Sequence, residues 1–128
     1  MNDTRVSPPV VNLLVIRSSD MQRAVEFYQA IGLRFALHRH GTGPEHYASE
    51  ESGFVFEIYP RKDTKNDTSR TRIGFRVENV DAIVNVLRNL QTTIVTEPAD
   101  TECGRRAVVK DFDGHSVELI TPKDRDKD

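Results

Sequence analysis

One strand pattern occurs twice in this chain, and it constrains the fold more than any other feature. The segments GFVFEIYP (residues 53–60) and HSVELITP (residues 115–122) each place a single glutamate, Glu57 or Glu118, inside an apolar strand that is followed by a proline. The segments upstream of each glutamate also follow one order: a strand, a helix and then three strands. The sequence therefore predicts an α+β fold made of one βαβββ module used twice.

The first half supplies a strand and a helix with clear signals. Residues 12–17 (NLLVIR) form a short apolar run that is typical of a buried strand. Ser19, with Gln22 three residues later, predicts a helix start, and Gly32 is placed to end that helix in a left-handed cap. Residues 33–40, 46–50 and 54–60 are the three strands expected next. The apolar helix face consists of Met21, Ala24, Val25, Tyr28 and Ile31.

The second half repeats the order. Residues 72–77 form a strand candidate, and a helix is expected from Asn79, with residues 92–97, 105–112 and 116–121 as the strands that follow. The turn DFDG (residues 111–114) predicts that the last two strands form a hairpin. The apolar face of this helix consists of Val80, Ile83, Val84, Leu87 and Leu90.

The domain organisation follows from the segments without apolar periodicity. Residues 61–70 (RKDTKNDTSR) contain no apolar residue and read as a linker between module one (11–60) and module two (71–122). Residues 1–10 and 123–128 are polar and are expected to be flexible tails. The prediction is a single domain over residues 11–122.

Composition excludes several classes of protein. The chain has 128 residues and a formal net charge of −2 with both signs interspersed, so no basic field for nucleic acid exists. A single cysteine, Cys103, excludes an internal disulfide. No N-terminal apolar run resembles a signal peptide or a membrane span, so we expect no membrane association and a cytoplasmic location.

Strand alternation sorts the polar residues onto one side of each sheet. Successive side chains of a strand point to opposite faces, so Glu57 and Tyr59 share the face opposite Phe56 and Ile58. The same alternation places Glu118, Arg72 and Arg76 opposite the apolar residues of their own strands. The apolar faces are expected to pack on the helices, and the polar faces to lie on the opposite side of each sheet.

The ordered set of local signals resembles the vicinal oxygen chelate superfamily, the group of glyoxalases, bleomycin resistance proteins and dioxygenases. The resemblance spans residues 11–122. It rests on the strand leading to Asp20, on AVEFYQAIGL (24–33), on CGRRAVVKDFDGHSVEL (103–119) and on the two glutamate strands. Phe112 stands where the family usually has proline, and Ile31 where it usually has leucine. The resemblance implies two curved mixed sheets that form a cleft on their concave side.

This sequence departs from the family's usual pattern of metal ligands. The resemblance implies four ligand positions, with His or Gln on the first strand of each module and Glu on the last. Glu57 and Glu118 match the glutamates, but Leu13 and Arg72 occupy the first-strand positions. Leucine cannot coordinate, and a guanidinium only donates hydrogen bonds. We therefore predict no metal and no cofactor, with Arg72 neutralising both carboxylates. The predicted ligand-binding cleft comprises Glu57, Glu118, Arg72, Arg76, Leu13 and Tyr59.

Three classes of function are compatible with this reading. The first is a small-molecule binding protein of the bleomycin-resistance type, expected as a homodimer whose metal-free cleft holds a ligand. The alternative is a divalent-metal-dependent enzyme of the superfamily: a glyoxalase-like lyase, an isomerase, a dioxygenase or a thiol transferase. The third is an interaction module with a vestigial cleft. No catalytic residue is assigned.

The remaining chemically capable residues each allow a plain structural role. His38 and His40 alternate on one predicted strand and, with His46, could supply imidazole ligands or a general base, or could simply be exposed strand residues. His115 is expected at the end of the hairpin turn. Cys103 has no recognisable base partner. Glu57 and Glu118 could be solvated residues on a half-exposed sheet, and Arg72 could be a structural charge clamp with no role in ligand binding.

Overall fold

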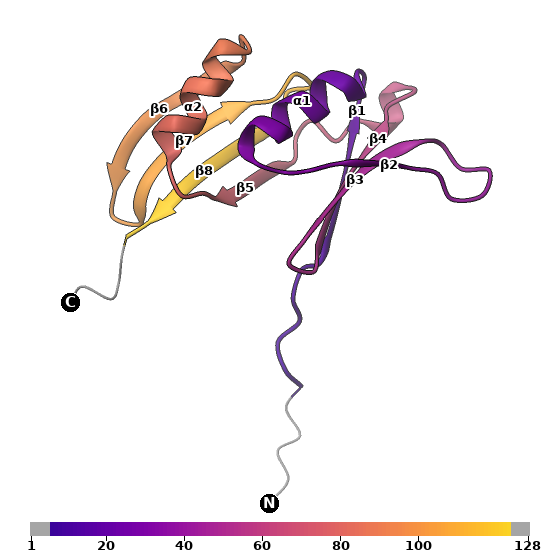
Figure 1. The fold of residues 1–128 in the computed structure, drawn as a ribbon, viewed down its shortest axis with the longest axis horizontal. Coiled ribbons are helices and arrows are strands. Elements are labelled where there is room, and N and C mark those ends of the chain that lie inside the picture. The colour runs from indigo at the N-terminus through magenta and orange to yellow at the C-terminus, as the bar shows by residue number, and fades with distance from the viewer. Residues whose placement is uncertain (1–5, 124–128) are drawn as a thin grey trace, which may run out of the picture.

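The two halves of the chain form two four-stranded sheets in the computed structural model, which describes residues 6–123 (Figure 1). The strand orders are β1-β4-β3-β2 and β5-β8-β7-β6. The predicted α+β class and the βαβββ order of both halves are confirmed. The elements are β1 (Leu13–Ser18), α1 (Met21–Ile31), β2 (Ala36–His38), β3 (His46–Glu51), β4 (Phe54–Pro60), the 3-10 turn η1 (Thr64–Asn66), β5 (Arg72–Arg76), α2 (Val80–Asn89), β6 (Thr93–Thr101), β7 (Gly104–Lys110) and β8 (Ser116–Pro122).

Each sheet contains one parallel pair, between its first and its last strand. β1 runs parallel to β4, and β5 runs parallel to β8, while the other pairs are antiparallel. The register places Val15 opposite Glu57 and Gly74 opposite Glu118. The two glutamates therefore occupy corresponding places in their sheets, and the predicted β7–β8 hairpin is present.

The helix ends agree with the sequence except at one residue. Asp20, not Ser19, caps α1, with its side chain accepting a hydrogen bond from the backbone N–H of Arg23. The backbone N–H and hydroxyl of Ser19 instead donate to Asp113. Gly32 ends α1 at φ 123°, a left-handed conformation that glycine tolerates, and Asn79 caps α2 as predicted.

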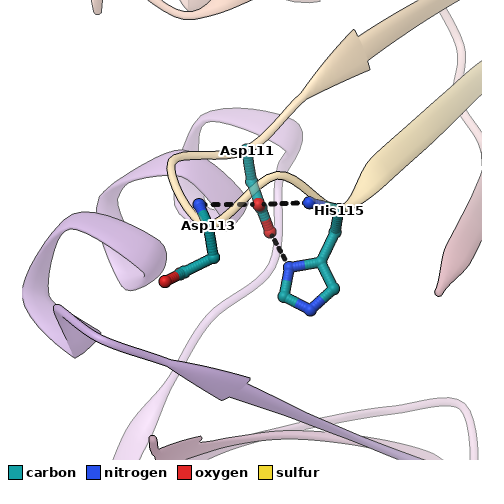
Figure 2. A group of neighbouring side chains, drawn as sticks. All are labelled: Asp111, Asp113 and His115. Carbon is teal, nitrogen blue, oxygen red and sulfur yellow. Dashed lines mark hydrogen bonds and ion pairs between the residues drawn. The ribbon is translucent and has the colours of Figure 1, made fainter. Parts of the chain in front are cut away.

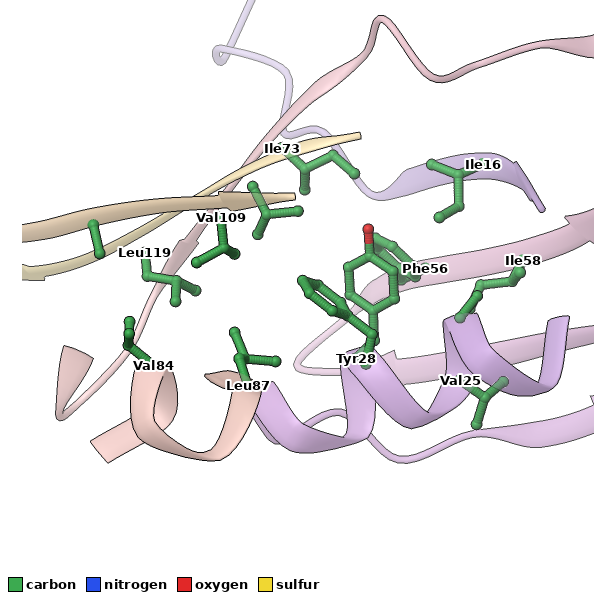
Figure 3. Close-up of a cluster of buried hydrophobic side chains, with 14 of the residues drawn as sticks. Ile16, Val25, Tyr28, Phe56, Ile58, Ile73, Val84, Leu87, Val109 and Leu119 are labelled. Carbon is green, nitrogen blue, oxygen red and sulfur yellow. The ribbon is translucent and has the colours of Figure 1, made fainter. Parts of the chain in front are cut away.

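A single core lies between the helices and the apolar faces of both sheets (Figure 3). The predicted alternation is confirmed, because Phe56 and Ile58 of β4 are buried while Glu57 between them is not. The rings of Phe56 and Phe75, which belong to different sheets, lie 6.0 Å apart, and Tyr28 of α1 contacts both. The apolar faces thus fuse into one core, and the opposite, open faces carry the charged residues.

Two strands differ in length from the prediction. Of residues 33–40 only Ala36–His38 form β2, and all three are exposed at the edge of the sheet. β6 extends to Thr101, beyond the predicted 92–97, and its pairing with β7 is interrupted by two register shifts. Pro98 lies within the second shift, where its missing N–H removes no ladder hydrogen bond.

Most of the two predicted tails, residues 1–5 and 124–128, lies outside the described residues. Residues 6–10 are exposed and without regular structure.

In the predicted linker 61–70, Thr68 contacts both modules. Its hydroxyl oxygen accepts a hydrogen bond from the backbone N–H of Arg17 at 2.9 Å and lies 2.7 Å from His115 Nε2. Across the described residues, neither helix is long and apolar enough to cross a membrane.

A buried carboxylate joins the two modules at the β7–β8 turn (Figure 2). Asp111 Oδ2 accepts from the Tyr28 hydroxyl at 2.6 Å and lies 2.8 Å from His115 Nδ1. Its Oδ1 accepts from the backbone N–H groups of Asp113 and His115. Asp113 in turn accepts from the Ser18 hydroxyl at 2.6 Å. The turn of module two is therefore hydrogen-bonded to α1 and β1 of module one.

Ionisation of Asp111 is part of this network. Burial opposes its charge, but hydrogen bonds from His115 and Tyr28, together with the charge of His115, outweigh burial and hold the pKa of Asp111 below its ordinary value. Burial, followed by the nearby Asp111 charge, raises the pKa of Tyr28 well above its ordinary value. Tyr28 therefore stays protonated and donates.

Replacing Asp111 with asparagine should lower the free energy of unfolding by at least about 2 kcal/mol at pH 7, because an amide N–H₂ would face the donors of Tyr28 and His115. Urea unfolding measures the loss, and Asp63→Asn, at the exposed cap of η1, is the matched control. The pKa of Asp111 is lower in the folded protein than its unfolded value of about 3.9, so its charge stabilises the fold above that pH. The difference in the free energy of unfolding between wild type and Asp111→Asn should therefore narrow below about pH 4. Equal stability of the two variants would contradict this role.

Candidate functional site

The open face of the first sheet forms a hollow around Glu57. Its volume is about 430 Å³, and His38 and His40 line it together with Glu57 and the ring of Phe35. The sequence left open whether these histidines reach the glutamate. The structure brings them to the same hollow, because the β2–β3 and β3–β4 registers place His38 on the face that carries Glu57.

His46 lies on the same face of the sheet as Glu57 and contacts it. Its side chain is 1% exposed, its ring stacks on Tyr59 at 4.1 Å, and its Nε2 lies 3.3 Å from Glu57 Oε2. Within the described residues Nε2 makes no hydrogen bond, so the two groups lie close together without one. The ring centroids of His38, His40 and His46 lie 5.3 to 6.0 Å apart. Glu57 thus faces imidazoles.

The open face of the second sheet presents Glu118 between two arginines. Arg106 Nε lies 3.0 Å from Glu118 Oε1, and Arg72 lies 3.7 Å from Oε2. Sequence reasoning missed Arg106, although the hairpin register carries the signal: Val108 pairs with Glu118, and Arg106 is two residues away on the same face. The carboxylate is therefore neutralised from two strands.

Arg72 pairs with one glutamate and not, as expected, with both. In the described part of the chain Arg72 contacts Glu118 only, and Glu57 contacts His46. The reason is topological, since Arg72 and Glu118 share a sheet whereas Glu57 belongs to the other. The Arg72 side chain is 59% exposed, so it is hydrated and not enclosed with two carboxylates.

The other predicted cleft residues are spread over the structure. Leu13, at the start of the edge strand β1, is 52% exposed. Tyr59 lies under the guanidinium of Arg17, 5.1 Å from its ring centre, and stacks on His46. Arg76 lines a different cavity, between the sheets. Membership of all six predicted residues in one cleft stays a prediction.

Ligand chemistry for a metal exists at two places. Asp111, Asp113 and His115 have potential ligand atoms within 4.8 Å of one another. The oxygens of the two aspartates and the His115 ring nitrogens already contact Tyr28, Ser18, Ser19, Thr68 or one another, so this group is a structural network. His38, His40 and Glu57 carry imidazole and carboxylate donors, the types that zinc and nickel take; they line one hollow, but within the described residues their ligand atoms are not gathered as those of Asp111, Asp113 and His115 are.

The fold and these paired glutamate strands define a class. The sequence model of the Glyoxalase/Bleomycin resistance protein/Dioxygenase superfamily matches residues 10–119. The chain belongs to this superfamily.

Individual relatives are distant and cover nearly the whole chain. An uncharacterized protein of Mycolicibacterium smegmatis is 24% identical over 115 residues, which are 90% of this chain and 96% of that protein. The structure is similar to TnmS3, an antibiotic binding protein from Streptomyces sp. CB03234, with a TM-score of 0.72, 21% identity and coverage of 93% and 100%. It is also similar to the oxidase ChaP-H2, with a TM-score of 0.73, 19% identity and coverage of 91% and 96%. These similarities show a shared fold.

Arg106 should stabilise the Glu118 site more than Arg72 does. Its ion pair is shorter and its side chain is 29% exposed against 59%, so the charge is less screened. In urea unfolding we expect Arg106→Ala to lose up to about 1 kcal/mol through the Glu118 pair and Arg72→Ala to lose less. Double-mutant cycles with Glu118→Gln isolate both couplings. A larger coupling for Arg72 would contradict the geometry.

Proposed function

We propose that this protein binds a small organic molecule in a cleft built from the open faces of its two sheets and holds no resident metal ion there. Glu57 and Glu118, at matching positions of the two modules, are the polar groups that we expect to contact the ligand. Phe35, in the hollow beside Glu57, adds apolar surface. A mixture of apolar surface with a few charged groups is typical of sites for small molecules.

The pair of arginines on Glu118 is the observation that carries this proposal. A divalent ion at the family's position would need Glu118 as a ligand and would meet the guanidinium charges of Arg106 and Arg72 beside it. Arg72 also stands at a position where the family supplies a ligand, and it has no lone pair to offer. The charge of Glu118 is balanced by protein groups without an ion.

The fold relative TnmS3, an antibiotic binding protein, supports the same class of function. The similarity lies in the fold, so it supports binding of a small molecule and names no ligand. Within this proposal the protein acts in the cytoplasm.

A homodimer is part of the proposal. β1 and β2 are the edges of the first sheet, and β5 and β6 those of the second, and unpaired edges favour pairing with another chain. Val10, Val11 and Leu13, around the start of β1, are 84%, 75% and 52% exposed. A second copy would cover this apolar segment.

A metal-dependent enzyme is the second candidate, and the histidines in the Glu57 hollow favour it. His38, His40 and Glu57 together could hold a divalent ion after side-chain rotation. The metal content of protein purified without chelator separates the two candidates. Stoichiometric zinc, nickel, iron or manganese that is lost in both His38→Ala and Glu57→Gln would establish the second candidate and overturn the first.

A thermal-shift screen over metabolites and antibiotics tests the binding function directly. A ligand of the cleft should raise the melting temperature in a saturable way. Glu57→Gln should weaken its binding at least about tenfold if the carboxylate accepts a hydrogen bond from the ligand. Glu97→Gln, which changes an exposed glutamate on β6, is the matched control. Hits that bind Glu57→Gln as tightly as wild type would contradict this site.

The dimer is tested by mass. Light scattering at micromolar concentration should give twice the 14.5 kDa of one chain. Leu13→Glu, which places a charge on the exposed apolar edge, should shift the mass to that of a monomer, whereas Val86→Glu, on an equally exposed part of α2, should not. A wild-type monomer would contradict the prediction.

A further inference from the structure

A second cavity lies between the two sheets, away from the open faces. Its volume is about 270 Å³. Its walls come from both modules and are mostly apolar, and they include Leu14, Phe54 and Phe56 from the first sheet and Phe75 from the second. The volume is near the lower end of the roughly 300–1,000 Å³ that small-molecule sites occupy, so an occupant would be small.

This cavity is separate from the hollow around Glu57. Ser49 of β3 and Phe56 of β4 form a cross-strand pair and both line the cavity. Their neighbours Ala48 and Glu57 form the next pair and line the open-face hollow. Because successive residues point to opposite faces, the sheet itself separates the two spaces.

Ser49 gives the cavity a polar group without a partner. Its side chain is 1% exposed, and its Oγ makes no hydrogen bond within the described residues. Buried hydroxyls are almost always hydrogen-bonded, because leaving one unpaired costs about 1 to 3 kcal/mol. An occupant with a hydrogen-bonding oxygen would satisfy it.

Gly74 contributes only its backbone to the cavity wall. It lies in the interior of β5 opposite Glu118, so a side chain at this position would point to the open face of the second sheet. The side chains of Ile73 and Phe75, on either side of Gly74, face the cavity.

We propose that this cavity is a second binding site, for a neutral aromatic molecule of one or two rings that carries a hydroxyl or carbonyl oxygen. The rings of Phe54, Phe56 and Phe75 favour an aromatic occupant through edge and offset contacts. The Ser49 hydroxyl hydrogen-bonds to the single oxygen. One acidic and one basic residue, Glu51 and Arg76, also line the cavity, so its lining has no net charge and favours a neutral ligand.

The test uses two probes, 2-naphthol and naphthalene, titrated into ¹⁵N-labelled full-length protein and followed by amide chemical shifts. Both should cause saturable shifts at Ser49, Phe56 and Gly74 and smaller ones at Glu118, on the open face of the second sheet. Leu14→Phe enlarges a side chain that lines the cavity and packs against the core, so it should weaken both probes at least tenfold.

Ser49→Ala separates the hydrogen bond from apolar packing. It should weaken 2-naphthol about two- to tenfold, the range expected for one net hydrogen bond, and leave naphthalene unchanged. Ala36→Leu, which fills the open-face hollow, is the reciprocal control and should bind both probes as wild type does. Leu33→Phe, at another partly buried residue of the cavity wall, replaces Leu14→Phe if that variant does not fold.

Several results would overturn this site. One is wild-type binding of both probes by a folded Leu14→Phe or Leu33→Phe protein; another is the absence of saturable shifts. If Ala36→Leu alone removes binding, the probes occupy the open-face hollow, a result that overturns the second site and supports the proposed cleft. Failure of the cleft proposal leaves the cavity test unaffected, because the two spaces share no lining residue.

Discussion

The relative position of the two modules depends on one buried carboxylate, Asp111. A charge at 5% exposure is tolerable only when donors surround it, and the donors here come from both halves of the chain: the Tyr28 hydroxyl from α1 and the His115 ring from the β7–β8 turn. Docking the modules and satisfying the carboxylate are therefore the same event. Asp113 extends the link to Ser18 at the end of β1, next to the helix cap. The hydrogen bond from Tyr28 adds a polar link beside the apolar core that the two sheets share.

The two sheets pack against each other through their apolar faces, so the glutamate on the open face of each sheet has neighbours from its own sheet. Glu57 is met by the imidazole of His46 and Glu118 by the guanidiniums of Arg106 and Arg72. The two solutions differ chemically, because an imidazole can accept, donate or coordinate whereas a guanidinium only donates. The two modules therefore carry matching glutamates in chemically different surroundings.

The sequence predicted what depends on local periodicity. The faces of β4, β5 and β8 followed from alternation alone, and the position of Asn79 and Gly32 at helix ends followed from the capping preferences of their side chains. Ser19 failed as a cap because Asp113, from the other half of the chain, uses it in a tertiary contact that no local pattern reveals. Arg106 was missed for the same kind of reason, since its place beside Glu118 depends on the β7–β8 register. The partners of Glu57 and Arg72 depend on how the two sheets pack against each other, which no local pattern reveals.

The first sheet is a partition between two kinds of space. On β3 and β4, the pair Ala48 and Glu57 faces a polar hollow, and the pair Ser49 and Phe56, one residue further along, faces an apolar cavity. One residue of strand is all that separates the two pairs, so a register slip would exchange their environments and bury a carboxylate among phenylalanines. The charge of Glu57 thus helps to fix the register that creates the apolar cavity. A polar residue on one face of the sheet in this way protects an apolar space on the other, and the same strands can present both kinds of surface without mixing them.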